Sequence, residues 1–471
     1  MRLTEVNVPR LVISAPQGKT GKTLVTVTLI LKLIERGLRV QVFKVGPDFI
    51  DPTYHSAASG RPCRNLDMYL HGPEKVLERF IRYSQDADLC IIEGVFGLYD
   101  SVDGLSEFGC TAQIAKILRA PVILVLNAER ATRSLVAIVR GLRNFDNLVN
   151  IRGVILTNVS SDKHYKKIEK AFKMYCKDIE VLGYIKRCSI IEELFKYRHL
   201  GLVPVPERLT YSQFEILKEF ANIDVDRVIE IASSAQPLRG YFEEIGNIEK
   251  YEVSIGIVQG RAFTFYYPEV IEQCFSLSSK VYIIDPETCQ ELPNIDILII
   301  GGGFPEELAA NLEKNKSLRK SIRKFAEEGG VIYAECGGLM YLTSKLLTLR
   351  NEEYDMCDVY EAYTVMLSRP VGHGYVYGVV NIDTPAYRAG IRLRGHEFHH
   401  SKILLRDSEV KIVMRLLRGR GLGDGTDGLL KWNAYAQYMH VHPDTFNYVH
   451  SLISYVVRKK GCGTIGRADR S

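Results

Sequence analysis

Short apolar runs alternate with longer amphipathic segments along the first half of the chain. The short runs are rich in β-branched residues, as buried strands are, and the segments between them repeat apolar residues at helical spacing. The expected strands are residues 11–15, 40–45, 89–93, 122–126 and 153–157. The expected helices are residues 25–36, 73–83, 111–118 and 132–145. Because strands that alternate with helices form parallel sheets, this half predicts a doubly wound α/β domain.

A second series of strands begins after a polar, charged stretch at residues 233–250, which we interpret as a linker. The expected strands of this half are residues 253–259, 281–285, 297–301, 331–335, 375–382 and 434–440. We place the boundary near residue 245, which gives two expected domains, residues 1–245 and 246–471. The second domain is also expected to be α/β, with a β-rich region before its last strand.

Composition and charge narrow the class of protein. The 471 residues are enough for two domains, and 46% apolar with 25% charged residues is typical of a soluble globular protein. A net charge of +5 is too small on this length to indicate nucleic-acid binding. The ten cysteines include no Cys-x-x-Cys pair, which argues against a disulfide framework or a zinc cluster. With no signal peptide and no apolar run long enough to span a bilayer, we expect a cytoplasmic protein without a membrane or nucleic-acid partner.

A glycine-rich segment, Pro-Gln-Gly-Lys-Thr-Gly-Lys-Thr at residues 16–23, lies between the first expected strand and an apolar helix. A phosphate-binding loop directs backbone N–H groups at phosphates, while a lysine reaches the outer phosphates and a hydroxyl binds Mg²⁺. Lys22 and Thr23 fit the last two roles. Pro16 replaces the first glycine of the usual pattern, and the alternative is a turn without a ligand. The candidate nucleotide-binding residues are Gly18, Lys19, Thr20, Gly21, Lys22 and Thr23.

Two acidic segments follow later strands of the same domain, at residues 44–55 and 90–100. Both are expected at the carboxyl edge of the sheet, where open α/β sheets bind ligands. Carboxylates beside a phosphate loop supply the hard oxygen ligands that Mg²⁺ requires. We expect Asp48 and Glu93 to join Thr23 as metal ligands.

The other acidic residues of these segments have a different expected role. Asp51 and Asp100, with Asp48, are candidate catalytic residues that contact substrate or shape the reacting geometry. For any single aspartate the alternative is a helix cap or a loop residue. Asn158 follows the strand at 153–157 and is a candidate for contacting the nucleotide base, with an ordinary turn asparagine as the alternative.

Cys336 lies in the segment Tyr-Ala-Glu-Cys-Gly-Gly-Leu-Met, between an expected strand and a helix-compatible stretch. Strand, sharp turn and helix form a nucleophile elbow, in which the helix N-terminus is expected to lower the thiol pKa. Gly302, in an earlier glycine-rich turn, and Gly337 are the expected oxyanion donors. A late histidine, His440 or His442, supplies a base. The alternative is that Cys336 is a small buried hydrophobe.

Seven segments occur in an order and form that resemble the cobyrinate a,c-diamide synthase family. They lie at residues 44–52, 93–100, 198–202, 262–268, 302–306, 334–342 and 395–399. The resemblance runs from about residue 10 to residue 450. It implies an N-terminal domain similar to dethiobiotin synthetase and a C-terminal class I glutamine amidotransferase domain.

The resemblance also implies an activity. Such enzymes use ATP, Mg²⁺ and L-glutamine to convert the a and c acetate side chains of cobyrinic acid, a tetrapyrrole carboxylate, to amides through an acyl phosphate. Relatives with the same layout amidate nickel sirohydrochlorin instead, and these motifs do not separate the two. A third hypothesis is a P-loop ATPase switch with a degenerate glutaminase domain, against which the presence of Cys336 and His440 argues. A homodimer is compatible with the sequence.

The resemblance bears on the choice of histidine. His440 matches the family's Ser-Tyr-x-His position, although Gln437 stands where the serine usually lies. His442 precedes Pro443 and Asp444, which resembles the His-Pro-Glu of other triad glutaminases. We favour His440, and expect the other histidine to be packed at a strand end.

Two further segments have less definite roles. Three histidines at residues 395–400 offer nitrogen ligands, but their spacing on an extended chain scatters the rings, so we favour a lining role over a metal site. The aromatic segment at 262–267 is expected either to stack on a tetrapyrrole or to pack in a core.

Overall fold

The computed structural model describes residues 2–195, 197–198, 201–205, 211–242 and 249–461. It divides into two compact units, Met1–Glu244 and Ile245–Ser471, and each unit has its own apolar core. The middle of the expected linker, residues 243–248, lies outside the described residues, as do residues 199–200 of one family motif. Within the described part of the chain, no helix is long and apolar enough to cross a membrane.

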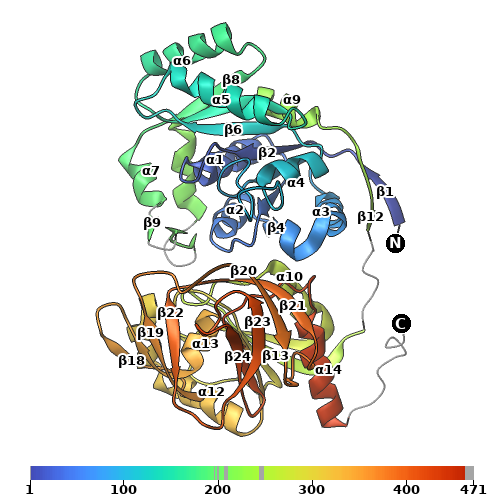
Figure 1. The fold of residues 1–471 in the computed structure, drawn as a ribbon, viewed down its shortest axis with the longest axis vertical. Coiled ribbons are helices and arrows are strands. Elements are labelled where there is room, and N and C mark those ends of the chain that lie inside the picture. The colour runs from blue at the N-terminus through green and yellow to red at the C-terminus, as the bar shows by residue number, and fades with distance from the viewer. Residues whose placement is uncertain (1, 196, 199–200, 206–210, 243–248, 462–471) are drawn as a thin grey trace. The chain divides into compact units, whose positions relative to one another are not determined.

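Unit 1 is built around an eight-stranded sheet of order β11-β8-β7-β6-β2-β5-β3-β4 (Figure 1). Neighbouring strands of this sheet run parallel, apart from the antiparallel pair β11 and β8. Its strands are β2 Arg10–Ser14, β3 Val40–Val45, β4 Arg64–Leu66, β5 Leu89–Glu93, β6 Val122–Asn127, β7 Ile151–Val159, β8 Glu180–Lys186 and β11 Ala221–Ile223. The strand order reverses at β2, so the carboxyl ends around β2 are where a ligand is expected.

The helices of unit 1 leave the central strands buried. They are α1 Lys22–Glu35, α2 Asp51–Ser59, α3 Met68–Ser84, α4 Thr111–Ile117, α5 Arg133–Phe145, α6 Asp162–Tyr175, α7 Ser189–Leu194, η1 Tyr211–Lys218 and α9 Val225–Ser233. Every residue of β2, β3 and β5 is buried, which explains why these strands are mostly apolar rather than alternating. Two short pairs complete the unit: β1 Arg2–Val6 with β12 Leu238–Phe242, and β9 Tyr197–Arg198 with β10 Gly201–Leu202.

Unit 2 contains a nine-stranded sheet of order β14-β13-β15-β16-β25-β24-β23-β20-β21. Strands β14 to β25 of this order are parallel, and the remaining pairs are antiparallel. Its strands are β13 Tyr251–Val258, β14 Ser278–Ile284, β15 Ile297–Ile300, β16 Val331–Glu335, β20 Gly372–Val380, β21 Arg392–His399, β23 Lys411–Arg418, β24 Thr426–Lys431 and β25 Ala434–Gln437. In the parallel half, β15, β16 and β25 therefore end at the same edge of the sheet. The glycine turn, the cysteine and the late histidines follow these three strands.

A second, four-stranded sheet of order β18-β17-β19-β22 packs in the same unit. Its strands are β17 Thr343–Leu347, β18 Glu353–Asp355, β19 Tyr360–Met366 and β22 Ser401–Leu405. The helices of unit 2 are α10 Pro268–Leu277, η2 Pro305–Leu308, α11 Ala309–Lys314, α12 Lys316–Glu327, α13 Gly337–Leu342 and α14 Tyr448–Lys460.

The predicted fold class, two α/β domains with parallel sheets, is confirmed. Three strands, β3, β5 and β16, have the predicted bounds. The strand expected at 434–440 ends at Gln437, so His440 follows the strand rather than lying in it. The four-stranded sheet was not predicted from the sequence.

Candidate active sites in the two units

The glycine-rich segment of unit 1 joins β2 to α1 and has the open form of a phosphate-binding loop. Gly21 precedes α1 with φ +94°, a left-handed conformation that favours glycine. Among the described residues, no heavy atom lies within 4 Å of the position that a Cβ on Gly18 would occupy. The first N–H groups of α1, a 14-residue helix, have no acceptor within the helix. The loop can therefore surround a phosphate at a helix N-terminus.

The two lysines of the loop lie in different surroundings. Lys19 is exposed, with φ +59°, whereas Lys22 is buried and donates to Phe96 O at 2.5 Å. Burial, together with the charge of Lys44, lowers the pKa of Lys22 to about 8. Thr20 O accepts a hydrogen bond from the Thr157 hydroxyl at 2.9 Å, which fixes the loop to β7. An anionic phosphate would offset the cost of burying the Lys22 ammonium.

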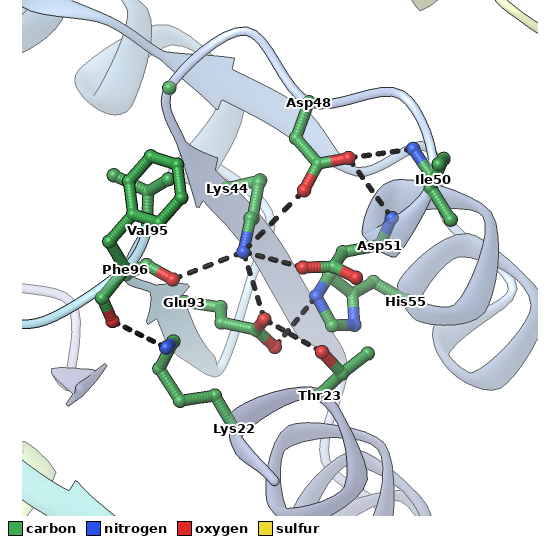
Figure 2. A network of polar contacts seen from close by, with 12 residues as sticks. Lys22, Thr23, Lys44, Asp48, Ile50, Asp51, His55, Glu93, Val95 and Phe96 are labelled. Atoms are coloured by element: carbon green, nitrogen blue, oxygen red, sulfur yellow. Dashed lines mark hydrogen bonds and ion pairs between the residues drawn. The ribbon is translucent and has the colours of Figure 1, made fainter. Parts of the chain in front are cut away.

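Lys44, the fifth residue of β3, is the centre of a buried charge cluster (Figure 2). Its Nζ lies 2.7 Å from Asp51 Oδ2, 2.9 Å from Glu93 Oε1 and 3.8 Å from Asp48 Oδ2, and donates to Gly94 O. Burial alone would lower the pKa of Lys44, but the three carboxylates raise it well above its usual range. The side chain is 2% exposed, so a permanent ammonium holds the acidic groups together.

Glu93, the last residue of β5, has a partner for each carboxylate oxygen. Oε1 accepts from the Thr23 hydroxyl at 3.1 Å as well as from Lys44, and Oε2 lies 2.9 Å from His55 Nε2 (Figure 2). Burial opposes its ionisation, yet Lys44 and His55 hold the pKa of Glu93 well below its usual range. Glu93 is thus an ionised carboxylate joined directly to the hydroxyl of the phosphate loop.

The two aspartates after β3 lie around the start of α2. Asp48 Oδ1 accepts from the N–H of Ile50 at 2.7 Å and of Asp51 at 3.3 Å, so this carboxylate also acts as a local cap. Asp51 is the first residue of α2 rather than a loop residue. Burial and the charge of Asp48 raise the pKa of Asp51 well above its usual range, against the opposite effect of Lys44.

Asp100 and Asn158 lie at the margins of this site. Asp100 Oδ2 accepts from the N–H of Gly97 at 2.8 Å, and a Cβ on Gly97 would lie 2.6 Å from Pro16 O. Asp100 therefore shapes the loop that packs against the phosphate loop. Asn158, near the end of β7 with φ +55°, donates from Nδ2 to Asn127 Oδ1 at 3.1 Å. Its contact with a nucleotide base stays a prediction.

Sequence reasoning did not identify Lys44 or His55 as part of this site. A lysine inside the buried run Val-Gln-Val-Phe-Lys-Val was a signal that could have found Lys44, because an unpaired ammonium is costly to bury. His55 gave no such signal, since α2 was not predicted and only folding brings this helix against β5.

In unit 2, Cys336 occupies a strained turn between β16 and α13. Its φ of +51° and ψ of −105° are unusual for a residue with a side chain. Its N–H donates to Gln437 O at 2.7 Å, which fixes the turn to β25. A Cβ on Gly338 would lie 2.5 Å from Ile300 O, so glycine is required where α13 passes β15. This is the strand, turn and helix geometry of a nucleophile elbow.

The expectation that the helix lowers the thiol pKa is wrong. Burial, with the charge of Glu306, raises the pKa of Cys336, and the N–H of Gly337 only partly opposes this. The thiol is 3% exposed and α13 has six residues, so desolvation of the thiolate outweighs the helix terminus. The resting thiol is therefore protonated at neutral pH and needs a base before it can attack.

His440 lies beside the glycine turn that contacts the elbow. Its Nδ1 lies 3.2 Å from Glu335 Oε2, and a Cβ on Gly302 would lie 3.2 Å from its Nε2. A Cβ on Gly337 would in turn lie 3.0 Å from Gly303 N, so the glycine turn after β15 touches the elbow. The imidazole therefore has one nitrogen on a carboxylate and the other beside the turn that contacts the elbow.

His442 has the surroundings of a packed histidine. Its Nδ1 accepts from the N–H of Asp444 at 3.1 Å, and its Nε2 lies 3.7 Å from Glu269 Oε2 on α10. The ring also packs on Tyr267, with centroids 4.3 Å apart. These contacts favour His440 over His442 as the base.

The expected oxyanion donor Gly302 needs a correction. Its N–H donates to Phe265 O at 3.3 Å, and its carbonyl accepts from the N–H of Phe265 at 2.9 Å. In this bridge the N–H of Gly302 is already used. The nitrogen of Gly303 lies beside Gly337 instead, which makes Gly303 the better partner for Gly337 in an oxyanion hole.

The remaining aromatic and histidine segments surround this site as packing. Phe263, Phe265 and Tyr267 are buried, which supports the core interpretation of the aromatic segment. His396 stacks on His440 at 5.0 Å, and His399 stacks on Tyr438 at 3.7 Å. Because these rings face separate partners, the structure does not gather them into a metal site.

Comparison with known proteins identifies both domains and the family. Residues 11–200 match the CobQ/CobB/MinD/ParA nucleotide binding domain, and residues 254–448 match the CobB/CobQ-like glutamine amidotransferase domain. The chain is 41% identical over 449 residues to the cobyrinate a,c-diamide synthase of Archaeoglobus fulgidus, covering 94% of this chain and 96% of that protein. It is 39% identical over 464 residues to the enzyme of the same name from Methanosarcina barkeri, covering 93% of each. The chain belongs to the cobyrinate a,c-diamide synthase family.

Proposed function

We propose that this protein is a ligase that amidates the a and c acetate carboxylates of cobyrinic acid, using ATP and the amide nitrogen of glutamine. The observation that carries the proposal is a phosphate loop with buried carboxylates and a thiol elbow with a histidine on one chain. The relatives named above are cobyrinate a,c-diamide synthases, and no observation favours nickel sirohydrochlorin as the acceptor.

The first unit fits Mg²⁺ together with ATP. The Thr23 hydroxyl and the carboxylates of Asp48, Asp51 and Glu93 gather around one ammonium, and such hard oxygen donors are those that Mg²⁺ prefers. Thr23, Asp48 and Glu93 would hold the ion, which supplies neutralisation of phosphate charge when bound. Because Glu93 already bonds Thr23, Lys44 and His55, it would reach the metal by exchanging one of these contacts or through water.

Activation of the acceptor explains why a nucleotide site is needed. A carboxylate is a poor electrophile because its charge is delocalised and oxide would have to leave. Attack of the carboxylate oxygen on the γ-phosphorus of ATP releases ADP and gives an acyl phosphate, which ammonia then converts to the amide with loss of phosphate. Lys22 would neutralise the phosphates during transfer, and Lys44 holds Asp51 and Glu93 together.

The second unit supplies ammonia. His440 takes the proton of Cys336 as the sulfur attacks the amide carbon of glutamine, and the N–H groups of Gly303 and Gly337, which lie close together, would stabilise the oxyanion. Transfer of that proton to the leaving nitrogen releases ammonia and leaves a thioester. Water then hydrolyses the thioester to glutamate.

The proposal is tested with Cys336→Ala, assayed with ATP and cobyrinic acid. This variant should lose amidation from glutamine but retain amidation from ammonium chloride, since only the sulfur is removed. Cys289→Ala, a change to a half-buried cysteine of the same unit, is the matched control and should retain both activities. If Cys336→Ala still used glutamine, or if the wild type amidated nothing from ammonia, the proposed function would be wrong.

A further inference from the structure

Glu335 is the carboxylate that contacts His440, and it lies one residue before the nucleophile. It ends β16 and is 5% exposed. Its Oε2 lies 3.2 Å from His440 Nδ1, while its Oε1 accepts from the N–H of Val441 at 3.1 Å and from the Tyr333 hydroxyl at 2.6 Å. Three contacts therefore fix both oxygens.

A buried polar network holds Glu335 in this orientation. The Tyr333 hydroxyl lies 2.8 Å from that of Tyr387 and accepts from Gln437 Nε2 at 3.2 Å. Burial, with the charge of Glu335, raises the pKa of Tyr333 well above its usual range, so the hydroxyl stays a donor. Gln437 also donates to Met439 O and accepts from the Tyr435 hydroxyl. Gln437, which stands where the family usually has a serine, is thus part of the network that holds Glu335.

Strand pairing explains how a residue next to the nucleophile reaches the base. Glu335 pairs with Gln437 across the parallel strands β16 and β25, and His440 follows three residues later. Cys336 is turned out of the strand by its positive φ, whereas Glu335 keeps the strand conformation. Glu335 therefore reaches the histidine from the same strand end that carries the nucleophile.

We propose, on the basis of the glutaminase function proposed above, that Glu335 is the positioning residue of the site and fixes the tautomer of His440. An ionised carboxylate only accepts hydrogen bonds, so Nδ1 must carry the proton and Nε2 the lone pair that takes the thiol proton. After that transfer, the Glu335 charge stabilises the imidazolium.

The other carboxylates near the histidines do not take this place. Asp444, which the sequence offers as part of a His-Pro-Asp motif, contacts His442 through its backbone N–H. Glu269 lies beside His442 Nε2.

Of the titratable groups that face the pair, His396 and five tyrosines are neutral at neutral pH, whereas burial raises the pKa of Asp427 to about 6. His396 stacks on His440, and burial together with the charge of His440 lowers the pKa of His396 well below its usual range. The groups around the pair, besides His396, are Cys336, Glu306, Asp427, Tyr266, Tyr333, Tyr387, Tyr435 and Tyr448. The tyrosines are buried with raised pKa values, so they remain neutral donors at neutral pH.

The test is Glu335→Gln in the full chain, assayed for glutamine hydrolysis without any tetrapyrrole. The amide oxygen can still accept from Tyr333 and Val441, but the NH₂ group would donate to Nδ1 and place the His440 proton on Nε2. We expect kcat for glutamine hydrolysis to fall about 10³- to 10⁴-fold with KM changed less than about threefold. Inactivation by 6-diazo-5-oxo-L-norleucine, which requires the same thiolate, should slow by a similar factor.

Two controls separate positioning from a structural role. Glu269→Gln makes the same substitution beside His442 and should leave the hydrolysis rate and its pH profile unchanged. The thermal midpoint of Glu335→Gln and its amidation from ammonium chloride should match the wild type. Hydrolysis within about threefold of the wild type, or an equal loss of the ammonia reaction, would overturn the assignment. If the wild type hydrolysed glutamine but left cobyrinic acid unchanged, the proposed acceptor would be wrong, whereas the role proposed for Glu335 would stand.

Discussion

At the scale of single residues, Lys44 is the most constrained group in the first unit. Lys44→Met should lower the free energy of unfolding by roughly 3–5 kcal/mol, because Glu93 would remain buried and ionised without its lysine partner. Urea denaturation measures this change in the free energy of unfolding, at the transition of the first unit. Lys173→Met is the control, since Lys173, paired with Glu169 on α6, is 71% exposed and its loss should change stability by less than about 0.5 kcal/mol. Equal effects of the two variants would contradict the cluster's role.

Lys22 gives the nucleotide site a pH dependence. Phosphate binding requires the ammonium, and the pKa of Lys22 in the free protein is about 8. Affinity for Mg²⁺·ATP should therefore be constant below about pH 7 and fall as the pH rises through about 8, by up to about tenfold per pH unit. Calorimetric titration between about pH 6.5 and 9.5 measures this. Lys22→Arg, which does not titrate in this range, should remove the alkaline fall; an unchanged fall in that variant would refute the assignment.

The residues that sequence alone could identify are those with local signatures. Lys22, Thr23 and Cys336 lie in short motifs whose geometry the neighbouring strand and helix dictate. Glu335 and His55 act through partners that are 105 and 38 positions away in the chain, so their contacts depend on strand pairing and helix packing. The thiol pKa was predicted in the wrong direction because burial of Cys336 is not visible in the sequence.

At the scale of elements, the approach of α13 to β15 is the tightest feature of the elbow. Gly338→Ala should destabilise unit 2 by roughly 1–3 kcal/mol and reduce glutamine hydrolysis, because the new Cβ would meet Ile300 O at 2.5 Å. Gly141→Ala is the control: within the described structure nothing lies within 4 Å of that Cβ, and Gly141 is inside helix α5. It should stabilise the protein by up to about 1 kcal/mol. Thermal and urea unfolding compare the two, and a neutral Gly338→Ala would contradict the packing described.

Strands and helices could be predicted where burial produces a clear pattern of apolar residues in the sequence. Strands β3, β5 and β16 are buried at every position and are mostly apolar, although β3 includes Gln41 and Lys44 and the other two end in a glutamate. Helix α2 begins with Asp-Pro and has only three buried residues, so its apolar pattern is weak. Strand β17 of the four-stranded sheet is neither buried at every position nor buried at alternate positions. Such short elements are specified by tertiary pairing more than by local pattern.

At the scale of the whole molecule, the two units have separate cores and separate ligands. Calorimetric unfolding should therefore show a transition that moves to higher temperature when a non-hydrolysable ATP analogue and Mg²⁺ are added. At a ligand concentration of 100 times Kd, the free energy of unfolding of that unit should rise by about 2.7 kcal/mol. Thr23→Ala should weaken that shift, because it removes the hydroxyl that bonds Glu93 and that we propose as a metal ligand. A nucleotide shift of equal size in Thr23→Ala would show that the loop is not the binding site.

The most direct measurement of the central claim is a competition assay read by liquid chromatography and mass spectrometry. The purified protein is given Mg²⁺·ATP, glutamine labelled with ¹⁵N at the amide, and equal amounts of cobyrinic acid and nickel sirohydrochlorin. The account predicts that cobyrinic acid gains two labelled amides, with ADP formed, while the nickel compound is spared. Amidation of the nickel compound in preference, or hydrolysis of glutamine with neither acceptor changed, would contradict it.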